Sequence, residues 1–306
     1  MGKEYWLSYS GYKTYRDCPK RYRLSRVERK DPPTPESKHF AVIGWTVQRV
    51  YEDFYNQELW RLRGKVSDAL LELAPKYFYQ YLDENHVDFN DITCKLEPME
   101  MLAQIEEIIP KVLTGIKREK LLGPYARSEI ILRAQLQSSY YLYGIVDFLI
   151  RQSTNEVLLI DGKASKHREK YVDEEQVDFY SLAFRLVHNR RPDKVGYFYY
   201  RFADDEEQAF DWHVPDAESE EKIRQNLVAA FTNIQKKRFG ATPSPSTCKW
   251  CPYETVCTER QQQIMAAREK KRWNRAERGE ETLPPLSKSS EGSVMIGFGG
   301  KLEDTK

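Results

Sequence analysis

The sequence lacks any long hydrophobic run, and its apolar stretches fall well short of the roughly 20 residues that a membrane helix needs. Its start, MGKEYWLSYS, also lacks the apolar region of a signal peptide. Cysteine is scarce, with 5 in 306 residues. We therefore expect a cytoplasmic protein with no membrane partner. In such a reducing compartment, clustered cysteines bind metal more often than they form disulfides.

The sequence also lacks a net charge that could indicate a partner, because 48 Lys and Arg stand against 47 Asp and Glu. Only the local distribution of charge can identify one. No G-x-x-x-x-G-K-[ST] motif is present, so we predict no helicase motor in this chain. A length of 306 residues suits one large domain or two small ones.

The pattern of apolar residues changes along the chain from helical to extended. Helical spacing runs from about 43 to 122, where the stretch LLGPYARSE ends it. Three β-branched and aromatic runs follow, EIILRAQLQ, YYLYGIVDFLI and EVLLIDGKAS. We then predict a helix in DEEQVDFYSLAFRLVHN, a strand in KVGYFYYRF and a helix over about 216–238. This order predicts a mixed α/β core.

Two further features lie near the C-terminal end. The stretch REKKRWNRAER, residues 268–278, predicts a basic helix whose charges we interpret as a solvated face rather than a DNA contact. From about Pro284 the chain is rich in Ser, Gly and Lys, and we expect it to be disordered.

Carboxylates within the predicted strands carry the strongest chemical signal. Asp147 ends YGIVD inside an apolar strand, and Asp161 ends EVLLID. Lys163 lies two positions after Asp161 and therefore on the same side of the strand, and Glu129 begins the first strand. A carboxylate in an apolar strand is costly unless it is paired or binds a metal. Carboxylates beside a lysine suit Mg²⁺ or Mn²⁺, which prefer oxygen ligands and can activate water.

Structural explanations compete with this one on the residues alone. A strand-end Asp can cap the next turn, and Asp161 with Lys163 can be an ordinary ion pair; we weigh these readings equally with the metal site. Gln176 and Tyr180 lie four apart and share one helix face, which by spacing alone indicates ordinary surface polarity.

A cysteine cluster lies near the C-terminal end, in TCKWCPYETVC. Cys248, Cys251 and Cys257 follow a C-x₂-C-x₅-C spacing with no fourth ligand nearby, and the remote Cys18, in YRDCPKRYRL, precedes a proline as Cys251 does. A Cys₄ zinc site and free thiols are the alternatives, although the spacing differs from that of a usual zinc ribbon. We expect Cys94 to be a small buried hydrophobic residue.

The N-terminal segment GYKTYRDCPKRYRLSRVERK holds 8 Lys and Arg against 2 acidic residues, with tyrosines interleaved. A basic surface with stacking aromatics is expected to bind single-stranded nucleic acid. The residues that we predict to contact DNA are Lys13, Arg16, Lys20, Arg21, Tyr22 and Arg23. The alternative is a solvated helix face.

The order of these motifs resembles the PD-(D/E)XK nuclease superfamily, and more closely its RecB-like exonuclease branch, whose motifs run G-x-x-D, D-x-K and Q-x-x-x-Y. The branch includes the CRISPR-associated RecB-like exonucleases and the AddB nuclease domain. The resemblance implies metal binding by Asp147, Asp161 and Glu129. It implies that Lys163 assists the attacking water, and that Gln176 and Tyr180 help to place DNA and metal-bound water.

The resemblance also bears on two other features. Many members of the branch carry a metal-binding histidine in an early helix, where this sequence has Gln48 in GWTVQ. Glutamine is a weaker ligand for Mn²⁺ than imidazole, so we expect an altered metal preference or reduced activity. A subset of the branch binds a structural [4Fe–4S] cluster through one cysteine before the nuclease core and three after it, which implies such a cluster at Cys18, Cys248, Cys251 and Cys257.

The fold that the resemblance implies is a restriction-endonuclease-like core, in which helices flank a mixed central sheet. It adds a helical N-terminal insertion and an iron–sulfur clasp between the two ends of the domain. We predict a single nuclease domain over 1–265 and, after it, the basic helix and tail of 266–306. Within the domain we place the basic segment with the first cysteine at 1–30, the helical region at 43–122, the catalytic core at 128–215 and the helix with the iron–sulfur segment at 216–265.

The activity that the resemblance implies is a Mg²⁺- or Mn²⁺-dependent deoxyribonuclease, expected to act as an exonuclease on single strands or free DNA ends. A separate helicase, recombination protein or CRISPR protein would be its partner, in a bacterial, archaeal or phage-infected cell. Two alternatives remain open: a weak or inactive DNA-binding or assembly protein that keeps the fold, which Gln48 favours, and a zinc-stabilised regulator.

Overall fold

The structure, a computed structural model, describes residues 4–278 apart from 34–36, 63, 92–93, 123–124, 153 and 169–171. The chain divides into two compact units, Met1–Glu254 and Thr255–Lys306. The tail that we predict to be disordered, from Pro284, lies outside the described residues. Within the described ranges, no helix is long and apolar enough to cross a membrane.

A mixed sheet of six strands forms the centre of the first unit. The strands are β1 (Tyr5–Ser8), β2 (Ala126–Gln137), β3 (Tyr140–Arg151), β4 (Val157–Lys163), β5 (Lys194–Tyr199) and β6 (Phe210–His213). β2 runs antiparallel to β3 along most of its length. β1 pairs in parallel with the first part of β3, and β4 pairs antiparallel with its last part. β5 extends the sheet parallel to β4, and β6 is antiparallel to β5.

The sheet divides on one side of β3. β1 pairs with β3 up to Tyr143, and β4 pairs with it from Phe148 onward. Between these two residues, the residues 144–146 of β3 have a paired strand, β2, on their other side only. We call this opening between β1 and β4 the fork.

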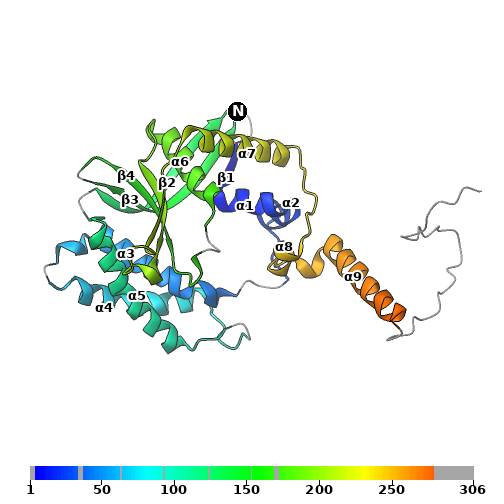
Figure 1. Cartoon of the computed structure of the whole chain (residues 1–306), viewed down its shortest axis with the longest axis horizontal. Coiled ribbons are helices and arrows are strands. Elements are labelled where there is room, and N and C mark those ends of the chain that lie inside the picture. The colour runs from blue at the N-terminus through cyan, green and yellow to red at the C-terminus, as the bar shows by residue number, and fades with distance from the viewer. Residues whose placement is uncertain are drawn as a thin grey trace, which may run out of the picture. The chain divides into compact units, whose positions relative to one another are not determined.

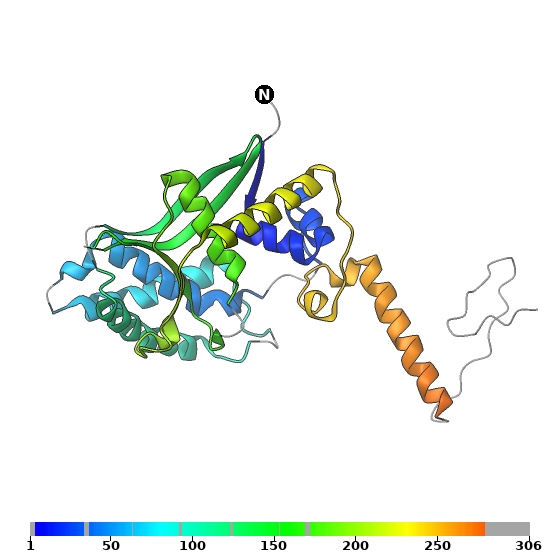
Figure 2. The same cartoon turned by 45° about the horizontal axis from the view of Figure 1, so that its top comes forward.

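Helices cover both faces of the sheet (Figure 1). On one side lie α3 (Val42–Asn56), α4 (Val66–Asn85) and α5 (Pro98–Arg118), and on the other lie α1 (Tyr9–Asp17), α6 (Glu174–His188) and α7 (Ala217–Gln235). The second view shows α1 beside α7 (Figure 2). The shorter elements are α2 (Pro19–Tyr22), a π-helical turn (Arg23–Val27), α8 (Pro245–Lys249) and the 3₁₀ turns Lys38–Ala41, Leu59–Arg61, Tyr200–Phe202 and Glu254–Val256. The second unit holds α9 (Thr258–Glu277), which includes most of the predicted basic helix.

The helix boundaries follow from local sequence. α5 begins with a capping box, in which the Glu97 side chain accepts from the backbone and Glu100 accepts from the Glu97 N–H, and Pro98 occupies the first helical position. α6 has Glu174 and Glu175 in its first turn and His188 in its last, as the helix dipole favours.

The two cores exchange faces of β3 at Asp147. Among the even-numbered residues, Leu142 and Val146 belong to the core beneath α1, α6 and α7, whereas Phe148 and Ile150 belong to the core beneath α3, α4 and α5. Strand residues two apart normally share one face. Val146 and Phe148 depart from this rule, so β3 twists at Asp147 and its even-numbered side chains change from one core to the other. Asp147 itself belongs to neither core.

The mixed α/β fold that we predicted is confirmed. Two strands were missed, β1 and β6, because each has only four residues. β1 lies just before the basic stretch GYKTYRDCPKRYRLSRVERK, which starts at Gly11. β6, FDWH, alternates too briefly for a pattern to emerge.

Candidate active site

Three carboxylates lie in one row across β2, β3 and β4. Phe148 pairs with Ile160 in the last matched pair before β4 leaves β3, so Asp147 and Asp161 are the next residues along the two diverging strands. Glu129 faces Asp147 from β2, within a break in the ladder, and has a positive φ of 54°. The fork therefore begins at a row of three acidic residues.

The carboxylate of Asp147 accepts a hydrogen bond from β4 that a backbone carbonyl of β3 would otherwise accept. The N–H of Gly162 has no acceptor on β3 once the strands diverge, and it donates instead to Oδ2 of Asp147 at 2.7 Å. Burial raises the pKa of Asp147 well above its ordinary value, and the negative charge of Asp161 raises it further. The Gly162 N–H and the Lys163 ammonium act in the opposite direction.

Asp161 is the buried centre of the site, with 7% of its surface exposed. One of its carboxylate oxygens forms an ion pair with the Lys163 ammonium. The other accepts from Nε2 of Gln176 at 2.9 Å. The Lys163 ammonium also lies 5.1 Å from the centre of the Tyr197 ring, where the aromatic face stabilises its charge.

Gln176 and Tyr180 reach the site from α6. Nε2 of Gln176 lies 3.4 Å from the Tyr180 hydroxyl, and Oε1 lies 3.2 Å from the Tyr197 hydroxyl. Burial raises the pKa of Tyr180 well above its ordinary value, so this hydroxyl is neutral at any ordinary pH. The structure thus brings together five predicted residues, namely Asp147, Asp161, Lys163, Gln176 and Tyr180.

The glycine between Asp161 and Lys163 makes room for a tyrosine. A Cβ atom at Gly162 would overlap the hydroxyl of Tyr200, which is 1% exposed. That hydroxyl donates to Oε1 of Gln48 on α3. Nε2 of Gln48 is buried and has no hydrogen-bond partner within the described residues. In this arrangement the Gln48 oxygen, which we predicted as a metal ligand, is already engaged by Tyr200.

Glu52 is a fourth acidic residue near the site, which the sequence motifs did not identify. It lies one helical turn after Gln48 on α3, and 5% of its surface is exposed. Burial raises the pKa of Glu52 to about 7, the charge of Glu129 contributes to the increase, and the paired Arg49 lowers it. Its spacing of four from Gln48 is the signal that could have found it.

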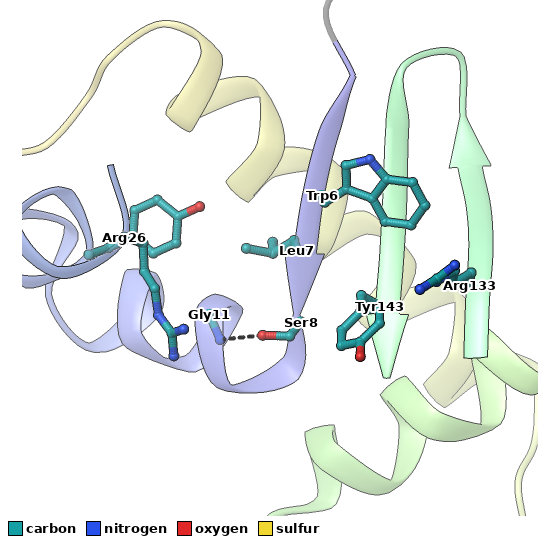
Figure 3. Close-up of a pocket in the computed structure, with 8 residues that line it drawn as sticks. Trp6, Leu7, Ser8, Gly11, Arg26, Arg133 and Tyr143 are labelled. Atoms are coloured by element: carbon teal, nitrogen blue, oxygen red, sulfur yellow. Dashed lines mark hydrogen bonds between the residues drawn. The ribbon is translucent and has the colours of Figure 1, made fainter. Parts of the chain in front are cut away.

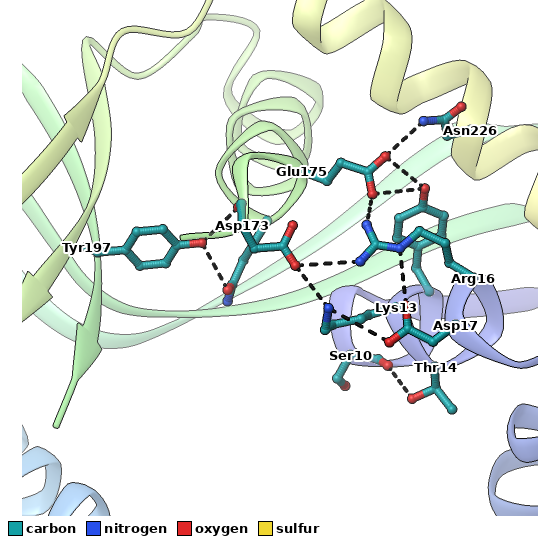
Figure 4. Close-up of polar contacts among 11 residues, drawn as sticks. Ser10, Lys13, Thr14, Arg16, Asp17, Asp173, Glu175, Tyr197 and Asn226 are labelled. Atoms are coloured by element: carbon teal, nitrogen blue, oxygen red, sulfur yellow. Dashed lines mark hydrogen bonds and ion pairs between the residues drawn. The ribbon is translucent and has the colours of Figure 1, made fainter. Parts of the chain in front are cut away.

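The predicted DNA-binding residues on α1 are held in an ion-pair network (Figure 4). Lys13 lies 3.3 Å from Asp173, and Arg16 pairs with Glu175 and lies 3.7 Å from Asp173. The backbone oxygen of Asp173 also accepts from the Tyr197 hydroxyl at 2.8 Å. The network therefore ties α1 to the first turn of α6, directly beside Gln176.

The other predicted DNA-binding residues follow α1. Tyr22 is 8% exposed and stacks on Phe239 at a ring-centre distance of 6.4 Å, so its position serves packing. Arg23 pairs with Glu28 at 3.1 Å. Lys20 and Arg21 lie on α2, and Arg21 borders a pocket of 350 Å³ with Tyr253.

Hydrogen bonds join the N-terminal helices to the segment after α7. The Tyr15 hydroxyl donates to the Arg238 carbonyl at 2.8 Å, and the Thr242 hydroxyl donates to the Asp17 carbonyl at 2.7 Å. The Tyr253 hydroxyl donates to the carbonyl of Lys30 at 2.7 Å. These contacts hold together the two segments that carry Cys18, Cys248 and Cys251.

None of the five cysteines forms a disulfide. Burial raises the pKa of Cys251, and the neighbouring Cys18 and Cys248 raise it further, so these three thiols lie within electrostatic reach of one another. Cys257 belongs to the second unit, where its Sγ lies 3.6 Å from Glu259. Cys94 lies apart from the others, with its Sγ 3.5 Å from the Leu96 carbonyl.

The donor chemistry at the fork suits a hard divalent cation, since Glu129, Asp147 and Asp161 offer only oxygen. The repulsion that raises the pKa of Asp147 is one that a cation would relieve. Among the residues that the structure describes, no group of three or more His, Cys, Asp or Glu side chains is arranged to hold a metal ion. Metal binding would therefore need side-chain adjustment around Asp161, whose oxygens contact Lys163 and Gln176.

Comparison with known proteins identifies one family. The model of the PD-(D/E)XK nuclease superfamily matches residues 6–258. The solved structure of SSO0001 is 16% identical, and the similarity covers 52% of this chain and 74% of that chain with a TM-score of 0.31. No curated protein matches the sequence.

Proposed function

Because the chain belongs to the PD-(D/E)XK nuclease superfamily, we propose that it is a metal-dependent deoxyribonuclease that hydrolyses phosphodiester bonds. The observation that carries the proposal is the fork, where Asp147, Asp161 and Lys163 lie together with the Gln176 amide. These residues share hydrogen bonds and an ion pair although they come from β3, β4 and α6. A structural ion pair alone would not require the Gln176 amide or a second carboxylate.

The cation would be held by Asp147 and Asp161, with Glu129 as a further ligand. When bound, Mg²⁺ or Mn²⁺ would polarise a phosphoryl oxygen and acidify a water molecule. Lys163 supplies a positive charge beside Asp161 and can orient the attacking water or offset developing negative charge. Gln176 fixes the orientation of the Asp161 carboxylate, and the neutral Tyr180 hydroxyl is available to donate to a phosphate.

Within the superfamily, the cysteines favour the RecB-like branch with an iron–sulfur cluster. Cys18, Cys248, Cys251 and Cys257 would hold a structural [4Fe–4S] cluster, since four thiolates leave no open position for hydrolysis. The hydrogen bonds between the two segments that carry Cys18 and Cys248 support a clasp at this place. Zinc would satisfy the same thiolates. The expected mode of action is digestion of single-stranded DNA from an end.

The test of catalysis compares cleavage with binding. The wild-type protein should digest end-labelled single-stranded DNA with Mn²⁺ or Mg²⁺, and Asp161→Ala or Lys163→Ala should lower the rate more than about 100-fold. DNA binding in EDTA should survive both changes. Asp211→Asn, on β6 of the same sheet, is the control and should cut normally. Labelling each end in turn identifies end-dependent digestion and its polarity.

The alternative is a DNA-binding or assembly protein without catalysis, which the engaged Gln48 oxygen favours. If the wild-type protein digests no DNA with either ion while it still binds DNA, this alternative replaces the nuclease.

The test of the cluster is metal content. After anaerobic purification, we expect a brown protein with iron and sulfide, and Cys18→Ser should lose both. Cys94→Ser is the matched control, because its Sγ lies apart from the other thiols, and it should keep them. A colourless protein that contains zinc would contradict the iron–sulfur assignment and leave the assignment of the nuclease site unchanged.

A further inference from the structure

A strip of half-buried side chains leads to the fork along β3. Tyr141, Tyr143 and Ile145 belong to neither core, and they precede Asp147 at intervals of two residues. Side chains at this interval share one face of a strand, and Tyr143 and Ile145 border the same pocket as Gln176 and Tyr180. At about 3.4 Å per residue, the strip is roughly 20 Å long.

An exposed tryptophan marks the far end of this strip. Trp6 of β1 pairs with Tyr141, and their rings stack with centres 4.7 Å apart and planes at 20°. Trp6 is 45% exposed, which is unusual for so large an aromatic side chain, and its N–H donates to Glu4 at 3.2 Å. The outer end of the strip is therefore an aromatic surface in contact with solvent. Figure 3 shows Trp6, Tyr143 and Arg133 on three neighbouring strands at this place.

Two guanidinium groups border the strip. Arg133 of β2 lies 6.0 Å from the centre of the Tyr143 ring. Arg26 lies 3.5 Å from the Ser10 hydroxyl. Neither has a carboxylate partner within the residues that the structure describes, in contrast to Lys13 and Arg16. Two uncompensated positive charges beside aromatic rings indicate an anionic ligand with flat apolar groups.

Two pockets connect this surface to the fork. A pocket of 490 Å³ contains Trp6 and Arg133, and a second pocket of 420 Å³ contains Gln176 and Tyr180. Both pockets share Ser8, Arg26 and Tyr143. A ligand that reaches the fork can therefore continue past Arg26 to Trp6 without leaving a concave surface.

We propose that this surface, which we call the β3 track, binds an unpaired DNA strand as it enters or leaves the fork. The proposal rests on the proposed nuclease function. Bases would stack on Trp6 and Tyr143, and Arg26 and Arg133 would contact phosphates. A duplex hides the faces of its bases, so only an unpaired strand can use the aromatic rings.

The experiment measures binding of a labelled oligonucleotide by fluorescence anisotropy in EDTA, where no cleavage occurs. We expect Trp6→Ala, Arg26→Ala and Arg133→Ala each to weaken single-strand binding about 10-fold. Duplex binding should change less. Melting temperatures should match the wild type, because the three side chains are exposed. A very short oligonucleotide that cannot extend from the fork to Trp6 should be insensitive to Trp6→Ala.

The far end of the β2–β3 pair offers residues for matched control variants. Arg151 lies 5.6 Å from the centre of the Tyr125 ring, and Tyr125 is 60% exposed. This pair repeats the chemistry of Arg133 and Tyr143, so Tyr125→Ala and Arg151→Ala should bind DNA normally. Salt dependence gives a second readout, since each arginine variant on the track should reduce the slope of log K against log salt by about 0.7, whereas Trp6→Ala should not.

Failure of the track is distinguishable from failure of the nuclease. If the wild-type protein cuts no DNA but the three variants lose single-strand binding, the track stands and the proposed catalysis fails. If all three variants bind single strands like the wild type, or lose single-strand and duplex binding equally, the track is overturned. A wild-type protein that cuts duplex ends but does not bind single strands would also overturn it.

Discussion

The Tyr197 hydroxyl lies between two oxygens of α6 and its N-cap, 3.2 Å from Oε1 of Gln176 and 2.8 Å from the backbone oxygen of Asp173, so its one hydrogen is shared between them. With its oxygen on the Tyr197 side, the Gln176 amide donates through Nε2 to Asp161 at 2.9 Å. Tyr197 on β5 therefore positions a residue of α6 against a residue of β4.

Tyr197→Phe should lower the cleavage rate about 5-fold, because a hydroxyl contact of about 1 kcal/mol that helps to orient Gln176 is lost. The ring would remain beneath Lys163, so the melting temperature should change little. Single-turnover cleavage and thermal unfolding of the same preparations test the two parts. Tyr199→Phe, two residues along β5, is the control and should cut at the wild-type rate. A normal rate for Tyr197→Phe would show that Gln176 holds its orientation without this hydroxyl.

Gly162→Ala should both destabilise the protein and reduce cleavage. Its Cβ would overlap the buried Tyr200 hydroxyl, so either β4 or Tyr200 must move. Overpacking of this kind costs about 1–3 kcal/mol. Urea unfolding monitored by circular dichroism measures the loss of stability.

Gly240→Ala is the matched control, because nothing lies within 4 Å of a Cβ atom there. It should unfold at the wild-type urea concentration. Equal midpoints for Gly162→Ala and wild type would mean that Tyr200 moves aside without cost.

Strand alternation was enough to place some site residues but not others. It puts Lys163 on the same side as Asp161, and the structure has the two in an ion pair. It could not show that β4 leaves β3 next to Asp147, because that depends on where β1 and β4 pair along β3. The position of β1 was unavailable from a segment of four residues.

The sequence motifs did not identify the residues that reach the site from distant parts of the chain. Glu52 lies on α3 and acts on Glu129 of β2, a contact that depends on how α3 packs against the sheet. The need for glycine at 162 arises from Tyr200, thirty-eight positions later. Patterns of local spacing contain no information about such contacts, which tertiary packing determines.

Glu52 should make the stability of the protein depend on pH. Its folded pKa of about 7 exceeds the ordinary value of 4.5, so between these values the unfolded chain has lost a proton that the folded protein keeps. Stability should therefore fall as the pH rises from 4.5 to 7, with the loss complete above 7. We expect this group to contribute a fall of about 1–3 kcal/mol.

Glu52→Gln removes the titrating group and should flatten this part of the profile. Urea unfolding in EDTA at several pH values from 5 to 8 compares the two proteins, and the variant should be the more stable at pH 8. EDTA is required because a divalent cation near Glu129 would favour the ionised carboxyl. If wild type and variant lose stability in parallel across this range, Glu52 titrates normally and the assigned coupling to Glu129 is wrong.

Glu220 connects α6 and α7 through a buried carboxylate that is 1% exposed. It accepts from the Ser181 hydroxyl at 2.7 Å and lies 2.6 Å and 2.9 Å from Nε of Arg185 and Arg191. Glu220→Ala would leave both guanidinium groups without their partner and create a cavity, at a cost of about 3 kcal/mol.

Glu221→Ala is the matched control, because it changes the neighbouring exposed residue, and it should leave the urea midpoint unchanged. Since α6 carries Gln176 and Tyr180, Glu220→Ala should also weaken cleavage at temperatures below its melting transition. If Glu220→Ala unfolds at the wild-type urea concentration, Arg185 and Arg191 are as well solvated without Glu220. The buried carboxylate would then contribute nothing to stability.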